Sequence, residues 1–548
     1  MASTYPSASV SYNRLQQVFC LNWLSNCAGS KTGTDESLTA FAESCVSQVL
    51  QDPTVIGLIG TWQVVWGPVV IVGEALPFKD VAANTMFVAQ QTGEDGGTTY
   101  VVAIAGTNPD SLYGWFGEDF DIENTLPWSQ ALGLDFTGAT INSDTTLPLI
   151  SAGTANGLDV LFNVMTDPLE SGTSLIQFLT NAVATAPTGP VEVIVTGHSL
   201  GGALSASTAL LLADTQGQTG GWDPSYRAIV SALPSAGAPP GNIVFAKHYD
   251  AVLGSRTNRV WNALDVIPHA WEPDLLLQAP HLYFPYLAPN AAVLALVDVV
   301  FGYTTTSQQT YLQLNRQTPP LPGQVDIAAT IPAPVSWEQL AIDEIASIVA
   351  EKVAKHYGWP AATRAALAKA IEAVLDAVEQ IEQAKNPPAA SATLGADQES
   401  IFAWLKSLGS DVTAHVDALV SFLVEELNLA ATDVQQILAQ LFQDAQGPLA
   451  ELAQVLEAAI GDVVKVFSRL IAWWVQQLQA IAKVLKCSLQ DVLPQLPGIV
   501  AFLTQLGIQH VPAYGELLGV AKYTALQKTI RASIPYPIPT PAPEPATA

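Results

Sequence analysis

The stretch 191–214, VEVIVTGHSLGGALSASTALLLAD, constrains the fold more than any other part of the chain. It begins with an apolar β-branched run, 191–195, which is typical of a buried strand. A Gly-His-Ser-Leu-Gly turn follows, and then an Ala- and Leu-rich run with helical spacing. A serine at the tip of such a strand–turn–helix unit exposes its hydroxyl to a base and a substrate. Because the turn is so tight, Gly197 and Gly201 must lack a Cβ. Ser199 is therefore predicted to be a nucleophile.

A serine nucleophile needs hydrogen-bond donors for the oxyanion that its attack creates. The backbone N–H of Leu200, at the start of the following helix, is predicted to be one donor. The second must come from a loop after an earlier strand. The β-rich run 98–104 ends in Ala-Gly-Thr-Asn-Pro. Thr107 is predicted to donate from its N–H and hydroxyl, the alternative being an ordinary turn at a strand end.

An acidic residue follows a later strand candidate. The segment 258–264, NRVWNAL, has the composition of a strand and is followed by Asp265. Acids just beyond the carboxyl end of a strand lie where α/β sheets place functional groups. In enzymes built around this turn the chain order is serine, acid, histidine. Asp265 is thus predicted to orient the base, the alternative being a helix cap or turn residue.

Seven histidines are candidates for the base: His198, His248, His269, His281, His356, His415 and His510. The first two precede the acid, and the side chain of His198 is expected to point away from the nucleophile. His269 lies too near Asp265 in the same loop, and His356 and His415 lie in helical patterns. His510 follows an apolar stretch and precedes a helix start, in a loop that can return to the sheet. It is favoured over His281, which lies only 16 residues (281 − 265) after Asp265.

These pieces together resemble the class 3 lipases, the fungal-type triacylglycerol lipase family of α/β-hydrolases. The matching segments, in order, are Ile104–Thr107, Thr196–Leu204, Asn262–Pro268, and His510 with Tyr514, Leu517 and Leu518. The resemblance covers roughly residues 55–330 and 505–525. It implies an α/β-hydrolase fold with a mostly parallel sheet, and hydrolysis of carboxylic esters with no cofactor and no catalytic metal.

The chain departs from the family pattern in two places. Ala105 stands where the family usually has Arg before Gly-Thr. The histidine also lies 245 residues (510 − 265) after the acid, far more than the family normally needs. A loop of that length inside one domain is expected to be a folded unit.

Composition shifts divide the chain into five parts. We expect a helical segment over 1–54, an α/β-hydrolase core over 55–330 and an all-helical insertion over 331–500. Residues 501–533 return to the core with the base, and 534–548 form a Pro-rich tail. The insertion is predicted to cap the active site, with partner binding or a purely structural role as alternatives.

The segment 110–128 mixes aromatic and acidic residues beside the predicted oxyanion loop. A flap that buries Tyr113, Trp115 and Phe116 when closed and offers them to lipid when open fits this pattern. A surface loop with its aromatics packed on the core fits equally well. With the insertion, this flap is predicted to control access to the site.

The balance of charged residues limits the classes of molecule that this protein is expected to bind. The chain carries 49 acidic against 21 basic residues, a net charge of −28. This argues against nucleic acid and against an anionic membrane surface as partners, and favours a neutral lipid or small ester, at a lipid–water interface in the case of a lipid. No run is suited to span a bilayer and no signal peptide is evident. Cytoplasmic location and secretion by another route therefore both stay open, and the sequence does not predict the oligomeric state.

The chain contains four cysteines, Cys20, Cys27, Cys45 and Cys487. They are expected to be buried free thiols rather than to form stabilising disulfide bonds.

Three functions remain in view. The first is a carboxylic ester hydrolase, a lipase acting on acylglycerols through Ser199, His510 and Asp265 and an acyl-enzyme. The second is an acyltransferase or phospholipase that uses the same fold. The third is a non-catalytic interaction protein on a hydrolase scaffold. The intact Gly-His-Ser-Leu-Gly turn argues against the third, because a scaffold needs no exposed serine.

Overall fold

A computed structural model describes residues 10–75, 79–93, 96–106, 121–167, 172–187, 189–289, 291–327 and 496–536. The chain divides into two units, 1–331 with 481–548 and 332–480, and every described residue belongs to the first. The predicted insertion, apart from its last residues, lies outside the described residues. So do Thr107, the flap aromatics Tyr113, Trp115 and Phe116, and Cys487.

A five-stranded sheet in the order β1-β2-β3-β8-β9 forms the centre. Its strands are β1 (Gln63–Ala75), β2 (Lys79–Thr92), β3 (Thr98–Ile104), β8 (Val191–His198) and β9 (Ala228–Ser235). The pairs β3–β8 and β8–β9 are parallel, as expected for the part that carries the turn at Ser199. The pairs β1–β2 and β2–β3 are antiparallel, because the chain between these strands is too short for a parallel crossover.

The segment 258–264, which follows α8 (Ile243–Leu253) in the chain, is predicted from the sequence to be a strand. It is extended but joins the sheet only through the single parallel bridges Ala232–Thr257 and Ser235–Val260. The sheet thus continues to the residue run that ends in Asp265, although without a regular ladder.

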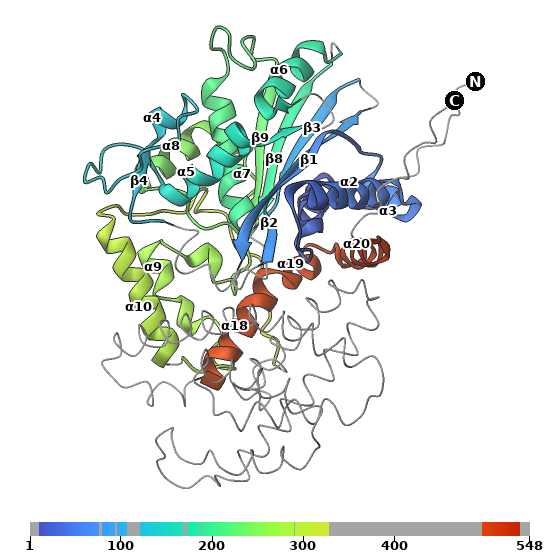
Figure 1. Ribbon diagram of the computed structural model, residues 1–548. Coiled ribbons are helices and arrows are strands. Elements are labelled where there is room, and N and C mark those ends of the chain that lie inside the picture. Colours follow the sequence, from blue (N-terminus) through green and yellow to red (C-terminus); the bar gives the residue numbers. More distant parts are fainter. Residues whose placement is uncertain are drawn as a thin grey trace, which may run out of the picture. The chain divides into compact units, whose positions relative to one another are not determined.

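Helices cover both faces of the sheet (Figure 1). One face carries α5 (Ala152–Asp159), α6 (Leu175–Thr185), α7 (Leu200–Thr215) and α8 (Ile243–Leu253). The other carries α1 (Arg14–Ser25), α2 (Asp35–Gln51), α3 (Pro53–Ile59) and α20 (Ala521–Ser533). Strand β3 shows why both faces are apolar. Tyr100 and Val102 pack into the first core, and Val101 and Ala103 into the second.

The N-terminal helices begin at well-formed caps. Asn13 and Gln16 form a capping box at the start of α1, and the Thr34 hydroxyl caps α2. Asp52 caps α3, with Pro53 in the first turn. Their apolar sides pack on the sheet, so this segment is part of the core rather than an appendage.

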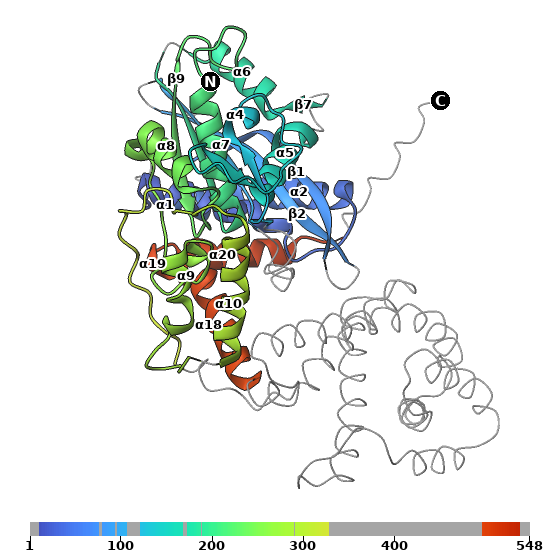
Figure 2. The same ribbon diagram turned by 90° about the vertical axis from the view of Figure 1, so that its left-hand side faces the viewer.

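The chain returns to the sheet through α18 (Leu496–His510) and α19 (Pro512–Leu517) before α20. Figure 2 shows α18 beside α10 (Ala291–Thr306), and a third core unites them through Val297 and Phe502. His510 is the last residue of α18, not part of an open loop. Shorter elements are β4 (Thr125–Pro127), α4 (Trp128–Ala131), β5 (Leu149–Ser151), η3 (Val160–Val164), β6 (Thr166–Asp167), β7 (Thr173–Ser174), α9 (Pro273–Leu276) and the 3-10 turns η1 (Asn26–Ala28), η4 (Gly254–Arg256), η5 (Ile267–His269) and η6 (Ala279–His281).

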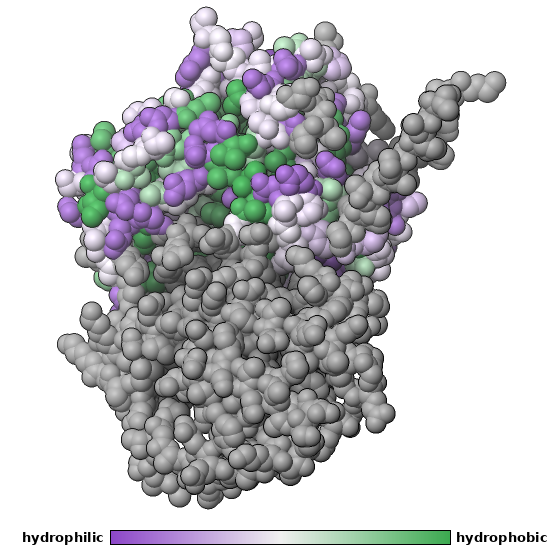
Figure 3. All heavy atoms as spheres, viewed as in Figure 1, coloured by the Kyte–Doolittle hydropathy of each residue, from purple (hydrophilic) through white to green (hydrophobic). Residues whose placement is uncertain are grey.

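On the face seen in Figure 3, hydrophobic residues are interspersed with hydrophilic ones, as on most protein surfaces. No helix among the described residues is long and apolar enough to cross a membrane. Cys20, Cys27 and Cys45 are buried free thiols.

Candidate active site

Ser199 lies at the sharp turn between β8 and α7, in a conformation that L-residues rarely adopt. Its φ of 62° and ψ of −123° lie outside the helix and strand regions. Such a conformation costs about 1–3 kcal/mol and persists only where the surroundings enforce it. Here the Ser199 N–H donates to the Ser235 carbonyl at 3.0 Å. The Ser199 Oγ is buried and has no hydrogen-bond partner among the described residues.

Close backbone contacts explain the glycines of this turn. A Cβ on Gly197 would lie 2.0 Å from the Gly201 carbonyl oxygen, and a Cβ on Gly201 would lie 2.5 Å from the Ile104 oxygen. The prediction that both positions must lack a Cβ is confirmed. Gly106, at the end of β3, meets the same turn, because a Cβ there would lie 2.5 Å from the His198 oxygen. The residue just before Thr107 therefore touches the Ser199 turn.

Asp265 and His510 form a buried pair. The His510 Nδ1 lies 2.9 Å from Asp265 Oδ2 and 3.0 Å from Oδ1. The carboxylate also accepts from the Tyr514 hydroxyl at 2.8 Å and from the Ile267 N–H at 3.0 Å. The Tyr514 hydroxyl in turn accepts from the Asn262 N–H at 3.0 Å. This network fixes the carboxylate and, through it, the plane of the imidazole.

Side-chain amides hold these distant parts of the chain together. The Asn262 Nδ2 donates to both the carbonyl and the Oε1 of Gln509, at 3.0 and 2.9 Å. The Gln509 Nε2 donates to the Gln324 carbonyl at 2.6 Å. The end of α18 is thereby bound to the segment that carries Asp265, although 245 residues separate the acid from His510.

His198 contradicts its expected orientation. Its ring centroid lies 4.8 Å from that of His510 and 5.1 Å from that of Tyr514, and His198 lines the same cavity as Ser199 rather than pointing away from it. The sequence could not show this, because it does not reveal that the end of α18 covers the end of β8. Burial, and secondarily the neighbouring His510, hold the pKa of His198 well below its usual value. The ring is therefore neutral near pH 7.

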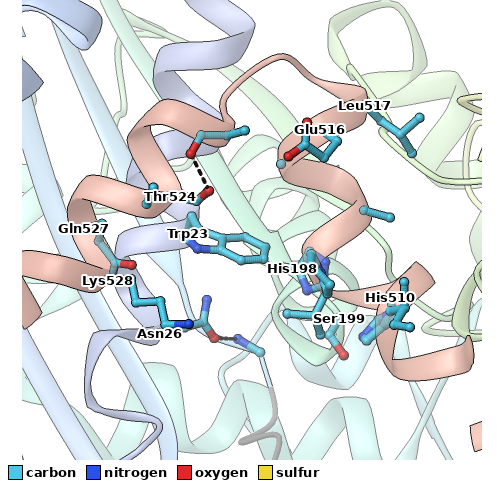
Figure 4. A pocket seen from close by; sticks show the side chains of 18 of the residues that line it. Trp23, Asn26, His198, Ser199, His510, Glu516, Leu517, Thr524, Gln527 and Lys528 are labelled. Carbon is cyan, nitrogen blue, oxygen red and sulfur yellow. Dashed lines mark hydrogen bonds between the residues drawn. The ribbon is translucent and has the colours of Figure 1, made fainter. Parts of the chain in front are cut away.

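A cavity of about 980 Å³ opens beside these groups. Ser199, His198 and His510 line it together with Trp23 and Gly106 (Figure 4). Much of its remaining wall is apolar and comes from Ile508, Val511, Pro512, Ala513 and Leu517. Its volume is at the upper end of the range of small-molecule sites.

Helix α1 supports the site in a way that the sequence analysis missed. The Asn26 Oδ1, just after α1, accepts from the Gly106 N–H at 3.0 Å. The Asn22 Nδ2 donates to the Ser235 Oγ at 3.0 Å, and that hydroxyl donates to the Gly197 carbonyl at 3.0 Å. The only available signal was a pair of asparagines four residues apart, which places them on one helix face.

The other histidines lie apart from this arrangement or outside the described residues. His281 is exposed on η6. His269 is buried, but its Nδ1 lies 2.7 Å from the backbone oxygen of Asp265, not from the carboxylate. Burial lowers the pKa of His269. His248 pairs with Asp214 at 2.7 Å, while His356 and His415 are not described.

The predicted oxyanion donors differ in what the structure shows of them. Leu200 is the first residue of α7, and Thr107 lies outside the described residues. Within the described part of the chain, no group of three or more His, Cys, Asp or Glu side chains is placed to hold a metal ion.

Comparisons with known proteins bear on the family. Residues 160–274 match the family model for lipase (class 3), which confirms the resemblance to that family over this part of the chain. The matched range contains both the Ser199 turn and Asp265. No curated protein matches the chain.

Several solved structures are similar to the chain. M37 lipase shares 28% identity over 57% of this chain and 86% of its own, with a TM-score of 0.47. A triacylglycerol lipase from Penicillium expansum shares 17% identity over 48% of this chain and 75% of its own, with a TM-score of 0.25. A lipase from Rhizopus microsporus var. chinensis shares 17% identity over 49% of this chain and 75% of its own, with a TM-score of 0.27.

Proposed function

We propose that this protein hydrolyses carboxylic esters as a lipase, with Ser199 as nucleophile, His510 as base and Asp265 as the acid that orients it. The observation that carries the proposal is the joint position of the three. The Asp265-bound imidazole and the buried, unpartnered Ser199 hydroxyl line one cavity. The class 3 lipase match over residues 160–274 supports the same chemistry.

The reaction would proceed in two halves. Ser199 Oγ attacks the ester carbonyl while its proton passes to His510 Nε2, because Nδ1 is engaged by Asp265. The tetrahedral oxyanion takes hydrogen bonds from the N–H of Leu200 and from Thr107. The imidazolium then protonates the leaving alcohol, which departs. Water, deprotonated by His510, then attacks the acyl-enzyme to form a second tetrahedral intermediate. This collapses as the imidazolium returns the proton to Ser199 Oγ, so that the acid is released and the serine is regenerated.

The strained serine supports catalysis over a scaffold role. A non-catalytic protein would gain nothing from a non-glycine residue at φ 62° whose buried hydroxyl forms no hydrogen bond with the described part of the chain. An acyltransferase would share every residue of the mechanism and differ only in the acceptor. Product analysis with an added alcohol would distinguish it from a hydrolase.

The substrate proposal is an acylglycerol or a similar lipid ester. The apolar wall of the cavity suits an acyl chain. Control of access by the flap and by the insertion remains part of this proposal. A deletion of residues 336–500 that left the preference among ester chain lengths unchanged would contradict the role of the insertion.

A fluorophosphonate probe tests the mechanism. It should label Ser199 in the full chain, and Ser199→Ala should abolish both the labelling and the hydrolysis of 4-nitrophenyl esters. His510→Ala should slow labelling and reduce turnover by about 10⁴-fold or more. His281→Ala is the matched control and should retain most of the activity. Full turnover in His510→Ala, or labelling that survives in Ser199→Ala, would contradict the assignment.

A further inference from the structure

The cavity beside Ser199 has a second end, formed by one face of α20. Thr524, Gln527, Lys528 and Arg531 all line it, and their spacing of three and four residues places them on the same side of the helix. In Figure 4 the Lys528 side chain reaches toward Asn26, and Trp23 lies between it and His198. The cavity therefore connects the nucleophile with a helix face that carries two cations.

The side chains of these two cations have no polar partner among the described residues. Neither the Lys528 ammonium nor the Arg531 guanidinium forms an ion pair or a hydrogen bond there. Glu516 is the one acidic residue among the described residues that line the cavity, and in Figure 4 it lies across Trp23 from Lys528. In a chain with 49 acidic and 21 basic residues, two unpaired cations facing one cavity depart from the overall charge.

Stability does not explain this arrangement. Like charges three residues apart on a helix repel each other by a few tenths of a kcal/mol. Among the residues that the structure describes, no carboxylate forms an ion pair with either cation to offset that repulsion. A bound anion would do so, because ammonium and guanidinium groups form their strongest hydrogen bonds with carboxylate or phosphate oxygens.

We propose that the site prefers esters that also carry a carboxylate or phosphate group, which Lys528 and Arg531 bind while the ester carbonyl lies at Ser199. This inference rests on the hydrolase function proposed above and narrows its substrate class. Gln527, only 4% exposed and lining the same end, offers an amide N–H to the same anion. The expectation of a neutral substrate came from the net charge of the whole chain, whereas local charge decides which group a cavity binds.

A pair of esters matched in length tests the preference by hydrolysis. The mono-4-nitrophenyl ester of octanedioic acid differs from 4-nitrophenyl octanoate only by a terminal carboxylate. The ratio of kcat/KM for the octanedioic ester to kcat/KM for the octanoate should fall about fivefold in Lys528→Gln/Arg531→Gln, an effect of the size expected for partly exposed charges. The fall should be smaller at high salt, because salt screens the charges. Lys522→Gln, an exposed cation of α20 that does not line the cavity, is the control and should keep the ratio.

Binding of octyl phosphate tests the preference without turnover and covers the phosphate source. Calorimetry with Ser199→Ala should give a Kd that rises about fivefold when the Lys528→Gln and Arg531→Gln changes are added. If only the carboxylate ester, or only octyl phosphate, responds to these changes, that response identifies the anion. An unchanged ester ratio together with an unchanged Kd would overturn the inference, even if octanoate hydrolysis upholds the proposed function. If the wild-type protein hydrolysed no ester but the Kd for octyl phosphate still rose when Lys528 and Arg531 were replaced, the hydrolase function would be overturned, whereas the binding of anions by these two cations would stand.

Discussion

The two halves of the candidate site are built in different ways. The Ser199 half is local, since β8, the turn and α7 are continuous and the decisive backbone contact joins Gly197 and Gly201. The acid–base half joins Asp265 to His510 and Tyr514, 245 and 249 residues away, through side-chain hydrogen bonds. The first half therefore depends on backbone sterics and the second on polar groups that meet only in the folded chain.

Replacing the acid should produce the largest effect. Asp265→Asn puts an amide where the carboxylate accepts from His510 Nδ1, and this favours the wrong imidazole tautomer. We expect kcat for 4-nitrophenyl esters to fall about 10⁴-fold, roughly 5.5 kcal/mol in activation free energy. Asp274→Asn, an exposed carboxylate in the first turn of α9, is the control and should change kcat little. A fall of less than tenfold for Asp265→Asn would exclude the orienting role.

The local half should fail through stability rather than through chemistry. Gly197→Ala places a Cβ 2.0 Å from a backbone oxygen that cannot move away cheaply. Denaturant unfolding should show a loss of at least about 3 kcal/mol in the free energy of unfolding. Gly507→Ala on α18 is the control, because nothing lies within 4 Å of the added Cβ. That variant should gain up to about 1 kcal/mol, since alanine favours the helix. Equal stabilities of the two variants would contradict the steric account.

Two buried tyrosines offer a finer test of the assembled half. Tyr514→Phe removes a hydroxyl that donates to Asp265 and accepts from the Asn262 N–H. We expect a loss of about 1–2 kcal/mol in the free energy of unfolding, and a kcat about tenfold lower because the carboxylate is less well fixed. Tyr283 is equally buried, but within the described ranges its hydroxyl has no hydrogen-bond partner, so Tyr283→Phe should cost almost nothing. Similar losses in both variants would show that the network does not position the acid.

The smallest predicted effect is a pH dependence of stability. Burial lowers the pKa of His198, and that of His269, below the value near 6.5 expected in the unfolded chain. Below pH 6.5 the unfolded state therefore binds more protons, so the free energy of unfolding falls as the pH falls. Between pH 6.5 and 5.5 we expect a fall of about 1 kcal/mol from His198, whose pKa lies well below its usual value, and a fall of the same sign from His269. His198→Gln should remove its share in pH-dependent unfolding curves, whereas the exposed control His281→Gln should not. An unchanged slope in His198→Gln would exclude this account.

The same division explains what the sequence could reveal. The Ser199 turn and its glycines were predicted because their constraint lies within five consecutive residues. Chain order led to Asp265 and His510, which the fold brings to 2.9 Å, but their catalytic roles remain predictions.

Other features depend on which segment covers which, and no local pattern records that. They include the position of His198 against His510, and the hydrogen bonds from Asn22 and to Asn26 that support the turn and the end of β3. The antiparallel start of the sheet was also missed, since apolar alternation does not give strand direction. The short connections between β1, β2 and β3 were the available signal.

The hydrogen bonds between α18 and the residues 324–326 have a consequence for how this chain tolerates change. Gln505 and Gln509 each donate to a backbone carbonyl of that segment, so described residues on the two sides of the stretch 328–495 are bound to each other at two neighbouring points. The entropy of closing a loop grows only with the logarithm of its length, about 0.6 kcal/mol for each doubling. Whatever sequence lies between these two points can lengthen, shorten or be exchanged over generations at little thermodynamic cost, provided that the two glutamines keep the exit and the return together.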